Sequence, residues 1–276
     1  MTIRAVHHLN CATMCPVAGF MLGGPSFARG HMVAHCLLVE TERDGLVLVD
    51  TGFGTRDIDG ASGLPAAFKA LCGPTLDRAE TAVAQVAALG FSPADVRHVV
   101  VTHLDLDHAG GLCDFPGARV HLHAREHAAA MTRGTFKERE RYLRAHWAHG
   151  PHWELYREDG DTWRGLPAVT RLRGLDADIA LVPMHGHTRG HSAIVVRDRE
   201  TWLVHAGDAY FHRNALAGAG RVPLGFVAFE RAVETDASAR RASLSALREL
   251  RANHPDVTVF CAHDVVEYGA FTSRRA

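Results

Sequence analysis

The sequence lacks any apolar run of about 18 residues, the length that a membrane-spanning helix requires, so no such helix is expected. The N-terminal stretch MTIRAVHHLN also lacks the long apolar segment of a signal peptide. Six cysteines occur in 276 residues, and none forms a CxxC pair. Cys11 and Cys15 are four positions apart, but no second pair follows, so we expect a structural or incidental role. The sequence therefore predicts a reduced, cytoplasmic protein.

An excess of charge of either sign is also missing. Lys and Arg number 30 against 31 Asp and Glu, which gives a net charge of -1. Without a basic surface, neither nucleic acid nor a membrane is an expected partner, which leaves a small-molecule substrate. No repeat or linker interrupts the chain, and 47% of its residues are apolar. We expect a single domain over residues 1–276.

The order of the expected elements favours an α/β fold with helices outside two sheets. Strands are expected at 31–41, 45–50 and 92–103, and a helix at 77–91 with Asp77 as its N-cap. A strand followed by a helix is expected over 118–131. Further strands are expected over 178–191, 192–211 and 256–264, and an amphipathic helix over 234–256. Residues 52–78 read as a long loop, and residues 134–165 as a helical insertion.

What the sequence has in abundance is histidine, with 20 in all. The segment VVVTHLDLDHAGG (99–111) puts two His and two Asp directly behind three valines. Because side chains alternate along an extended chain, His103, Asp105 and Asp107 would point the same way, and His108 would join them at the turn. This mixture suits zinc, iron or manganese rather than calcium. The alternative is a capped loop in which the aspartates accept backbone amides and the histidines are solvated.

Three later segments repeat the pattern. MHGHTRGH contributes His185, His187 and His191, VHAGDAY contributes Asp208, and VFCAHD contributes His263. Each segment follows or ends an apolar strand. A site built from several strand ends holds its groups on a rigid frame.

The blocks LVLVDTG, THLDLDHAGG, HGHTRGH, HAGDA and FCAHD, in this order, resemble the metallo-β-lactamase superfamily of metal-dependent hydrolases. The resemblance covers about residues 30 to 268. It implies a four-layer αβ/βα sandwich with a dinuclear metal centre at one edge of the two sheets. The C-terminal block AHDVVEY is most similar to the quorum-quenching lactonase branch.

The resemblance also implies the ligands of two divalent metal ions, with zinc preferred and iron or manganese as alternatives. The first ion would be bound by His103, Asp105 and His187. The second would be bound by Asp107, His108 and His263. Asp208 would bridge both ions, and Asp50 would orient a ligand from behind. His191 would be structural, and His185 falls outside the pattern.

Two positions depart from the family. Asp105 stands where the superfamily usually has His, which adds a negative charge. This favours iron, manganese or zinc with open coordination, or weakens the first site until only the second binds metal. The lactonase branch has a tyrosine where this chain has Phe211. Tyr210 is one residue earlier and is expected to face the opposite way.

The resemblance implies a hydrolase that opens a lactone or acyl ester by attack of a metal-bridging hydroxide. Asp107 and Asp208 would be its catalytic carboxylates, with Asp107 also shuttling a proton. Thioester hydrolysis, as in glyoxalase II, and phosphodiester hydrolysis stay open. So do a mononuclear iron oxidoreductase acting on a thiol or persulfide, and a member that binds without turnover.

Two regions are candidates to border the substrate pocket, although no substrate-binding residue is assigned. Trp147, Trp153 and Trp163 would line it from the 134–165 segment, with core packing as the alternative. The apolar stretch GFMLGGPSF (19–27) would form either the pocket mouth or a homodimer contact.

Overall fold

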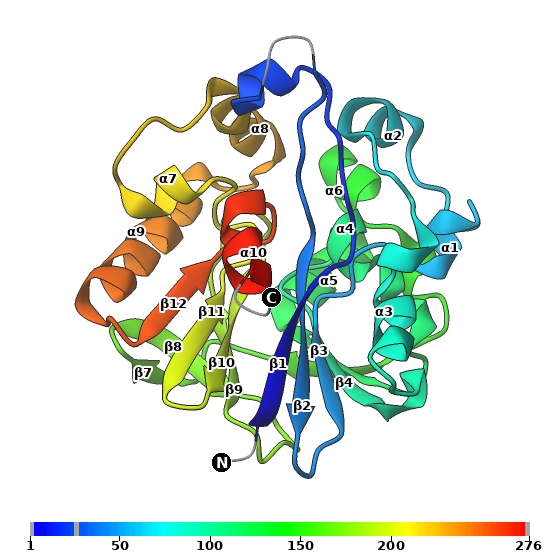
Figure 1. The fold of residues 1–276 in the computed structure, drawn as a ribbon, viewed down its shortest axis with the longest axis vertical. Helices are drawn as coiled ribbons and strands as arrows, with labels where there is room; N and C mark the ends of the chain where they lie inside the picture. Colours follow the sequence, from blue (N-terminus) through cyan, green and yellow to red (C-terminus); the bar gives the residue numbers. More distant parts are fainter. Residues whose placement is uncertain (1–2, 25–27, 274–276) are drawn as a thin grey trace.

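Two six-stranded sheets form the centre of the molecule in the computed structural model, which describes residues 3–24 and 28–273 (Figure 1). The first sheet contains, in spatial order, β1 (Ile3–Asn10), β2 (His35–Thr41), β3 (Leu46–Val49), β4 (Val96–Val100), β5 (Arg119–His123) and β6 (His152–Tyr156). The second contains β12 (Val257–Phe260), β11 (Thr201–His205), β10 (Ser192–Asp198), β9 (Ile179–Pro183), β8 (Leu166–Arg171) and β7 (Asp161–Trp163).

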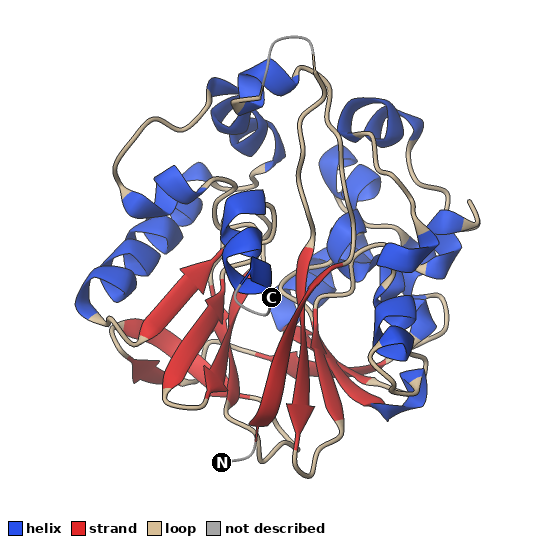
Figure 2. Cartoon of the chain, in the orientation of Figure 1, coloured by secondary structure: helices blue, strands red, loops and turns tan. Residues whose placement is uncertain are grey.

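Helices flank the strands and cover one end of the sheets (Figure 2). The α-helices are α1 (Thr55–Ile58), α2 (Ala66–Cys72), α3 (Ala82–Ala88), α4 (Leu106–Ala109), α5 (Ala124–Thr132), α6 (Phe136–Arg141), α7 (Arg213–Ala217), α8 (Leu224–Val233), α9 (Ala237–Asn253) and α10 (Val265–Thr272). The short 3₁₀ turns are η1 (Gly19–Leu22), η2 (Arg78–Glu80), η3 (Pro93–Asp95), η4 (Gly110–Asp114) and η5 (Arg144–Trp147). Among these helices, none has both the length and the apolar character needed to cross a bilayer.

The two sheets pack face to face through a buried aliphatic layer. Val39 and Val100 of the first sheet share this layer with Ile194 and Val196 of the second, and all four are fully buried. Val99 and Val101 point the other way, into the layer under the helices of the first sheet. The continuous valine run is therefore buried on both faces, as its composition predicts.

Helices complete the outer layers. Leu244, Leu247 and Leu250 of α9 pack onto the outer face of the second sheet, as the predicted amphipathic stripe requires. Val86 of α3 and Ala130 of α5 pack onto the outer face of the first sheet. The order helix, sheet, sheet, helix confirms the predicted four-layer αβ/βα sandwich (Figure 1).

The structure corrects several predicted elements. The strand β1 is absent from the predictions, because the two histidines in IRAVHHLN interrupt its apolar pattern. The predicted helix 77–91 is divided: Asp77 caps η2, and Thr81 caps α3. The predicted loop 52–78 contains α1 and α2.

The segment 134–165 is helical only in its first half. It contains α6 and η5, but then forms β6 and β7 at the edges of the two sheets. Its second half is therefore part of the sheets. The single-domain organisation over residues 1–276 remains a prediction.

Candidate metal centre

All seven predicted metal ligands meet at one edge of the sandwich. They follow the C-terminal ends of four strands, namely β4, β9, β11 and β12. Their ligand atoms form three overlapping groups within 4.8 Å: His103, Asp105 and His187; His103, His108 and Asp208; and Asp107, His108 and His263. Five of the side chains are nearly inaccessible, whereas Asp105 and Asp107 each expose 13%.

Asp208 lies between the two halves of this cluster. Its Oδ1 is 3.3 Å from His108 Nε2 and 3.0 Å from His263 Nε2. Its Oδ2 faces the other half, 3.8 Å from His103 Nε2 and 3.4 Å from His187 Nε2. One carboxylate therefore presents one oxygen to each half, the arrangement expected of a ligand shared by two cations.

Hydrogen bonds on the side away from the cluster determine the tautomers of three histidine rings, those of His108, His263 and His103. The Nδ1 of His108 donates to Asp50 (2.8 Å), and the Nδ1 of His263 donates to the carbonyl of Val33 (2.7 Å). His103 Nδ1 lies 2.9 Å from the Thr102 hydroxyl, which itself donates to Asp50. With the proton on Nδ1, each neutral ring directs the lone pair of Nε2 into the cluster.

Two observations test whether cations fit here. The Nε2 atoms of His108 and His263 face each other at 3.4 Å, which two lone pairs tolerate only with a proton or a cation beside them. Among the described residues, His103 Nε2 and Asp208 Oδ1 are buried without a hydrogen-bond partner. Such orphaned atoms are costly in a folded protein unless another group satisfies them. The donor set therefore fits divalent metal ions.

The electrostatics agree. Burial opposes charging His108, yet Asp208, Asp50 and Asp107 raise its pKa well above the usual value. Burial likewise opposes charging His263, but Asp208 and Asp107 raise its pKa. Burial lowers the pKa of His187 to about 4 despite the nearby carboxylates. The site attracts positive charge strongly enough to hold protons where a cation would bind.

Asp50 supports the cluster from an unusual backbone conformation. Its φ is 54°, in the left-handed region that non-glycine residues rarely adopt. In return, its buried carboxylate accepts the amide (2.7 Å) and hydroxyl (2.8 Å) of Thr102 as well as the ring of His108. Backbone strain of this kind is typical of functional sites.

Gly207 allows the turn after β11 to bring Asp208 into the cluster. Its φ is 52°, and an added Cβ would lie 2.6 Å from His191 Nε2. That ring accepts the amide of Asp208 at 2.9 Å and donates to the carbonyl of Met184 at 2.8 Å. With both nitrogens engaged, His191 positions Asp208 rather than joining the cluster.

Arg141 is a site residue that sequence reasoning missed. It lies on α6, 8% exposed, and its Nε is 3.2 Å from Asp105 Oδ1. Its other nitrogens donate to the carbonyls of His187 (3.0 Å) and Val233 (2.8 Å). Burial opposes ionisation of Asp105, but Arg141 holds its pKa well below the usual value. The negative charge that Asp105 adds is therefore balanced by an arginine from a distant segment.

Glu126 is a second residue that the sequence did not reveal. This fully buried carboxylate on α5 accepts the amide of Leu104 (3.1 Å) and the hydroxyl of Tyr142 (2.9 Å). Its other oxygen accepts the hydroxyl of Thr188 (2.6 Å) and the amide of Gly190 (3.0 Å). Glu126 thus joins the segment that carries His103 and Asp105 to the one that carries His187. An isolated Glu within a helical stretch gives no sequence signal for this role.

Tyr210 and Phe211 face opposite ways, as predicted. The ring of Phe211 stacks on His263, with centroids 5.3 Å apart and planes 6° apart. The hydroxyl of Tyr210 instead donates to Glu267, 3.1 Å away, on α10. Tyr210 is therefore directed away from the cluster.

An apolar cluster lies beside the metal ligands. Phe53, Leu106 and Phe211 belong to it, and Phe68 and Leu143 pack against it from the 52–78 and 134–165 segments. For the three tryptophans the structure supports the core-packing alternative. Trp147 and Trp153 pack in the core outside the first sheet, and Trp163 packs in the core outside the second.

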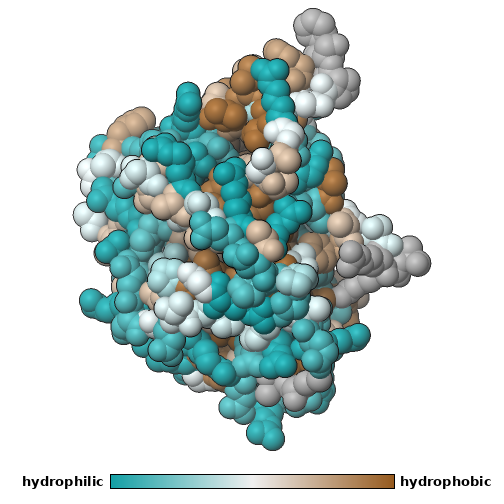
Figure 3. Space-filling model, turned by 90° about the vertical axis from the view of Figure 1, so that its left-hand side faces the viewer, coloured by the Kyte–Doolittle hydropathy of each residue, from teal (hydrophilic) through white to brown (hydrophobic). Residues whose placement is uncertain are grey.

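Residues 19–24 of the apolar stretch form part of an exposed apolar surface. Phe20 and Met21 of η1 are 55% and 41% exposed, and Leu224 of α8 is 59% exposed. Figure 3 shows apolar side chains gathered at the upper end of the molecule, where η1 and α8 lie. Residues 25–27 of the stretch lie outside the described part, and a homodimer contact here stays a prediction.

Comparison with known proteins gives consistent matches. The family model of the metallo-beta-lactamase superfamily matches residues 29–263. Probable metallo-hydrolases of Mycobacterium bovis and Mycobacterium tuberculosis are each 42% identical over 94% of this chain and 80% of their own length. The N-acyl homoserine lactonase AttM of Azorhizobium caulinodans is 34% identical over 45% of this chain and 44% of its own.

A solved structure is similar over nearly the whole chain. It is an N-acyl homoserine lactone hydrolase with N-hexanoyl-L-homoserine, its product, at the catalytic metal centre. The TM-score is 0.73 at 18% identity, and the match covers 98% of this chain and 97% of the other. At this identity the likeness supports the fold.

Proposed function

The chain belongs to the metallo-beta-lactamase superfamily and is a metallo-hydrolase, and from this premise we propose that it opens lactones or acyl esters with two bound metal ions. The single observation that carries the proposal is the position of Asp208. Its two oxygens face separate histidine pairs, so it would bridge two ions.

The ligand assignment follows the geometry. His103, Asp105 and His187 would hold one ion, and Asp107, His108 and His263 would hold the other. Zinc suits this mixture of imidazole and carboxylate, with iron and manganese as alternatives. When bound, such ions supply Lewis acidity, which lowers the pKa of a shared water and polarises a substrate carbonyl.

The remaining chemistry belongs to the chain itself. Asp107 is part-exposed, with its carboxylate oxygens 3.7 Å and 4.0 Å from His263 and His108, so we assign to it the transfer of a proton to the leaving oxygen. Asp50 holds His108 in the tautomer that ligation needs. Arg141 keeps Asp105 ionised beside His187.

The surroundings favour a neutral, partly apolar substrate. Phe211 and Leu106 adjoin the ligands, and the cluster they belong to is otherwise built from aliphatic and aromatic side chains. Lactones and acyl esters fit such a wall better than phosphodiesters, which cationic side chains usually recognise. The partial similarity to N-acyl homoserine lactonases points in the same direction.

The test combines metal analysis with a substrate panel. Protein purified without chelator is analysed for metals, and initial rates are measured on N-acyl lactones, acyl esters, a thioester and a phosphodiester. We expect two ions in the candidate centre and the highest kcat/KM on a lactone or ester. Asp208→Asn should reduce kcat at least a hundredfold and release metal, with Asp198→Asn as the surface control.

Other outcomes would replace the proposal. A single iron ion together with oxygen uptake on a thiol would establish an oxidoreductase instead. Two bound ions with no turnover on any panel member would indicate a member that binds without catalysis. A thioester preferred a hundredfold would assign the glyoxalase II class of reaction.

A further inference from the structure

A second group of metal-binding side chains lies apart from the candidate metal centre. His123 ends β5, Glu158 follows β6, and His185 follows β9. One ligand atom of each lies within 4.8 Å of the corresponding atoms of the other two. The rings of His123 and His185 meet edge to face with centroids 4.9 Å apart. Since β5 and β6 belong to the first sheet and β9 to the second, the group joins the two sheets.

His123 carries the strongest sign of a missing ligand. The residue is only 2% exposed, and its Nε2 is buried with no hydrogen-bond partner anywhere in the described chain. Its Nδ1 is engaged, since it accepts the amide of Arg125 at the start of α5 (3.2 Å). Burial, together with His185, lowers the pKa of His123 to about 4, so the ring is neutral near pH 7. A neutral imidazole is the form that binds metals.

His185 and Glu158 complete the group. His185 Nε2 donates to Glu158 Oε1 at 2.8 Å, and its Nδ1 is buried without a partner among the residues that the structure describes. The same Oε1 lies 3.1 Å from Arg125, the cation that now pairs with Glu158. The Arg125 side chain is 58% exposed, so it can move aside at little cost.

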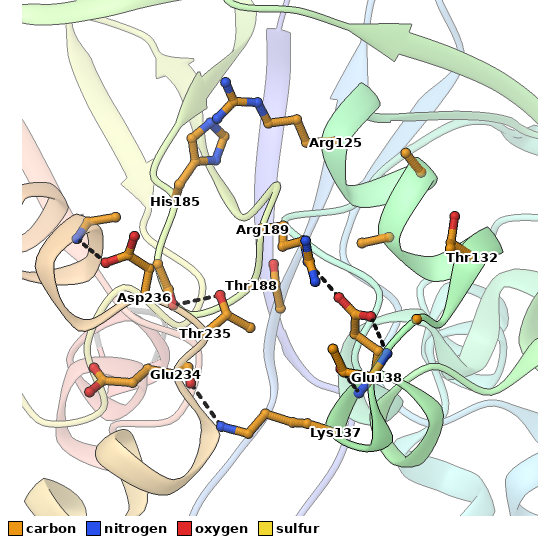
Figure 4. A pocket seen from close by; sticks show the side chains of 16 residues that line it. Arg125, Thr132, Lys137, Glu138, His185, Thr188, Arg189, Glu234, Thr235 and Asp236 are labelled. Carbon is orange, nitrogen blue, oxygen red and sulfur yellow. Dashed lines mark hydrogen bonds and ion pairs between the residues drawn. The ribbon is translucent and has the colours of Figure 1, made fainter.

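The group is reachable from solvent. His185 and Arg125 lie together at one end of an open cavity of about 1000 Å³ bordered by α5, α6 and the start of α9 (Figure 4). Glu158 is itself 40% exposed. An ion can therefore enter without passing through the candidate metal centre.

We propose that His123, His185 and Glu158 bind a divalent transition-metal ion, with zinc as the best match. Two imidazoles and one carboxylate are a common zinc ligand set that leaves a fourth position for water. In the metal-free ring the proton of His123 is on Nε2, because Nδ1 accepts the Arg125 amide. Binding through Nε2 would transfer that proton to Nδ1 and give up one capping bond, a small cost beside three metal–ligand bonds.

The ion would serve the fold rather than the reaction. It would connect the end of β5 to the segment between β9 and β10, which also carries His187. Glu126, three residues after His123, already joins these segments through Thr188 and Gly190. A metal ion here would add a second, stronger connection between the two sheets.

The experiment counts bound zinc. Wild type and variants are stripped with chelator, dialysed against the same buffered free zinc concentrations, and analysed for zinc per chain. His123→Asn removes the ligand but keeps a good N-cap for α5, and Glu158→Gln removes the exposed carboxylate. His127→Asn, on the same helix and in contact with Trp153, is the matched control.

We expect His123→Asn and Glu158→Gln each to bind one zinc fewer than wild type and His127→Asn. Equal stoichiometry in all four proteins would overturn the proposal. The result is independent of the proposed hydrolase. A dinuclear candidate centre gives a fall from three ions to two, a mononuclear one a fall from two to one, and an empty one a fall from one to none. If His127→Asn also lost one zinc, the lost ion would be bound by surface histidines in general. That result would also overturn the proposed site.

Discussion

At the residue scale, Arg141 balances the negative charge that Asp105 adds to the candidate metal centre. A buried carboxylate without a partner is strongly destabilising. Arg141 supplies the balancing charge and also binds two carbonyls, so its position is determined by three separate contacts. A metal ion beside Asp105 would supply part of the same charge.

Arg141→Met should therefore affect the metal-free protein most. We expect the free energy of unfolding to fall by about 3 kcal/mol without metal. The loss should be smaller with zinc, because the ion compensates Asp105. Urea denaturation of both forms measures this. Arg43→Met, which removes one partner of an ion pair with Asp176 whose side chains are 77% and 60% exposed, is the control and should cost under about 1 kcal/mol. An equal loss with and without zinc would contradict charge compensation.

Glu267 contributes to the free energy of unfolding in a way that depends on pH, and the sign of this dependence follows from its raised pKa. Burial raises its pKa to about 7, from a usual value of 4.5. The folded state therefore holds this proton more tightly than the unfolded state. The stability that Glu267 contributes is fully present below its pKa in the unfolded state. This stability is lost as the pH rises through its pKa in the folded state.

Glu267→Gln should remove this dependence. Relative to wild type, the variant should gain up to about 3 kcal/mol of unfolding free energy between pH 4.5 and pH 8. Urea denaturation across that range measures the difference, in which contributions from all other groups cancel. Glu249→Gln on the exposed face of α9 should show a constant difference. A parallel pair of curves for Glu267→Gln would refute the raised pKa.

At the scale of elements, α5 is the support behind the candidate metal centre. Its buried Glu126 accepts four hydrogen bonds from three segments that are distant in sequence, namely the loop after β4, the end of α6 and the loop after β9. The N-cap residue of the helix is His123, so the same helix also carries a ligand of the proposed structural zinc site. Both sites therefore depend on how firmly α5 is held.

Glu126→Gln should loosen that support. The amide would place N–H donors against a backbone amide of Leu104 or Gly190, leaving one buried donor unsatisfied. We expect a loss of about 2 kcal/mol in stability and a 10- to 100-fold weaker zinc affinity. Isothermal titration and urea denaturation measure the two effects. Glu140→Gln, exposed on α6, should change neither. Unchanged zinc affinity would show that Glu126 serves packing alone.

At the scale of the whole molecule, the candidate metal centre lies between the two halves of the sandwich. His103 and His108 follow strand β4 of the first sheet, whereas Asp208 and His263 follow β11 and β12 of the second. Metal ions shared by these residues would oppose separation of the sheets, so metal binding and global stability should be linked.

Zinc should therefore raise the melting temperature. At a free zinc concentration of about 100 times Kd, stability should rise by about 2.7 kcal/mol, or roughly 5 to 10 °C in Tm. Calorimetry of chelated and zinc-loaded protein measures the shift. Asp208→Asn should lose most of it, because that carboxylate contacts ligands from both halves. A full shift in Asp208→Asn would place the stabilising zinc elsewhere.

The sequence by itself determined the layers and predicted the candidate ligands. Apolar runs that end in His or Asp predict strands with polar C-terminal ends, and parallel strands present those ends at one edge. These signals are local, so the clustering of His and Asp at strand ends and the leucine stripe of α9 could be predicted without a structure. The assignment of seven candidate ligands and of Asp50 came from the resemblance to the superfamily. The opposite directions of Tyr210 and Phe211 followed from the same alternation.

Only the tertiary structure decided which distant groups meet those ligands. Arg141 approaches Asp105, Glu126 joins two loops, and His123 comes beside His185 across the two sheets. Each contact links segments far apart in the chain, and a charged residue in a helix has the same sequence pattern whether it faces solvent or a buried partner. The packing of the two sheets makes that choice, because it determines which charges are removed from water and must find a partner.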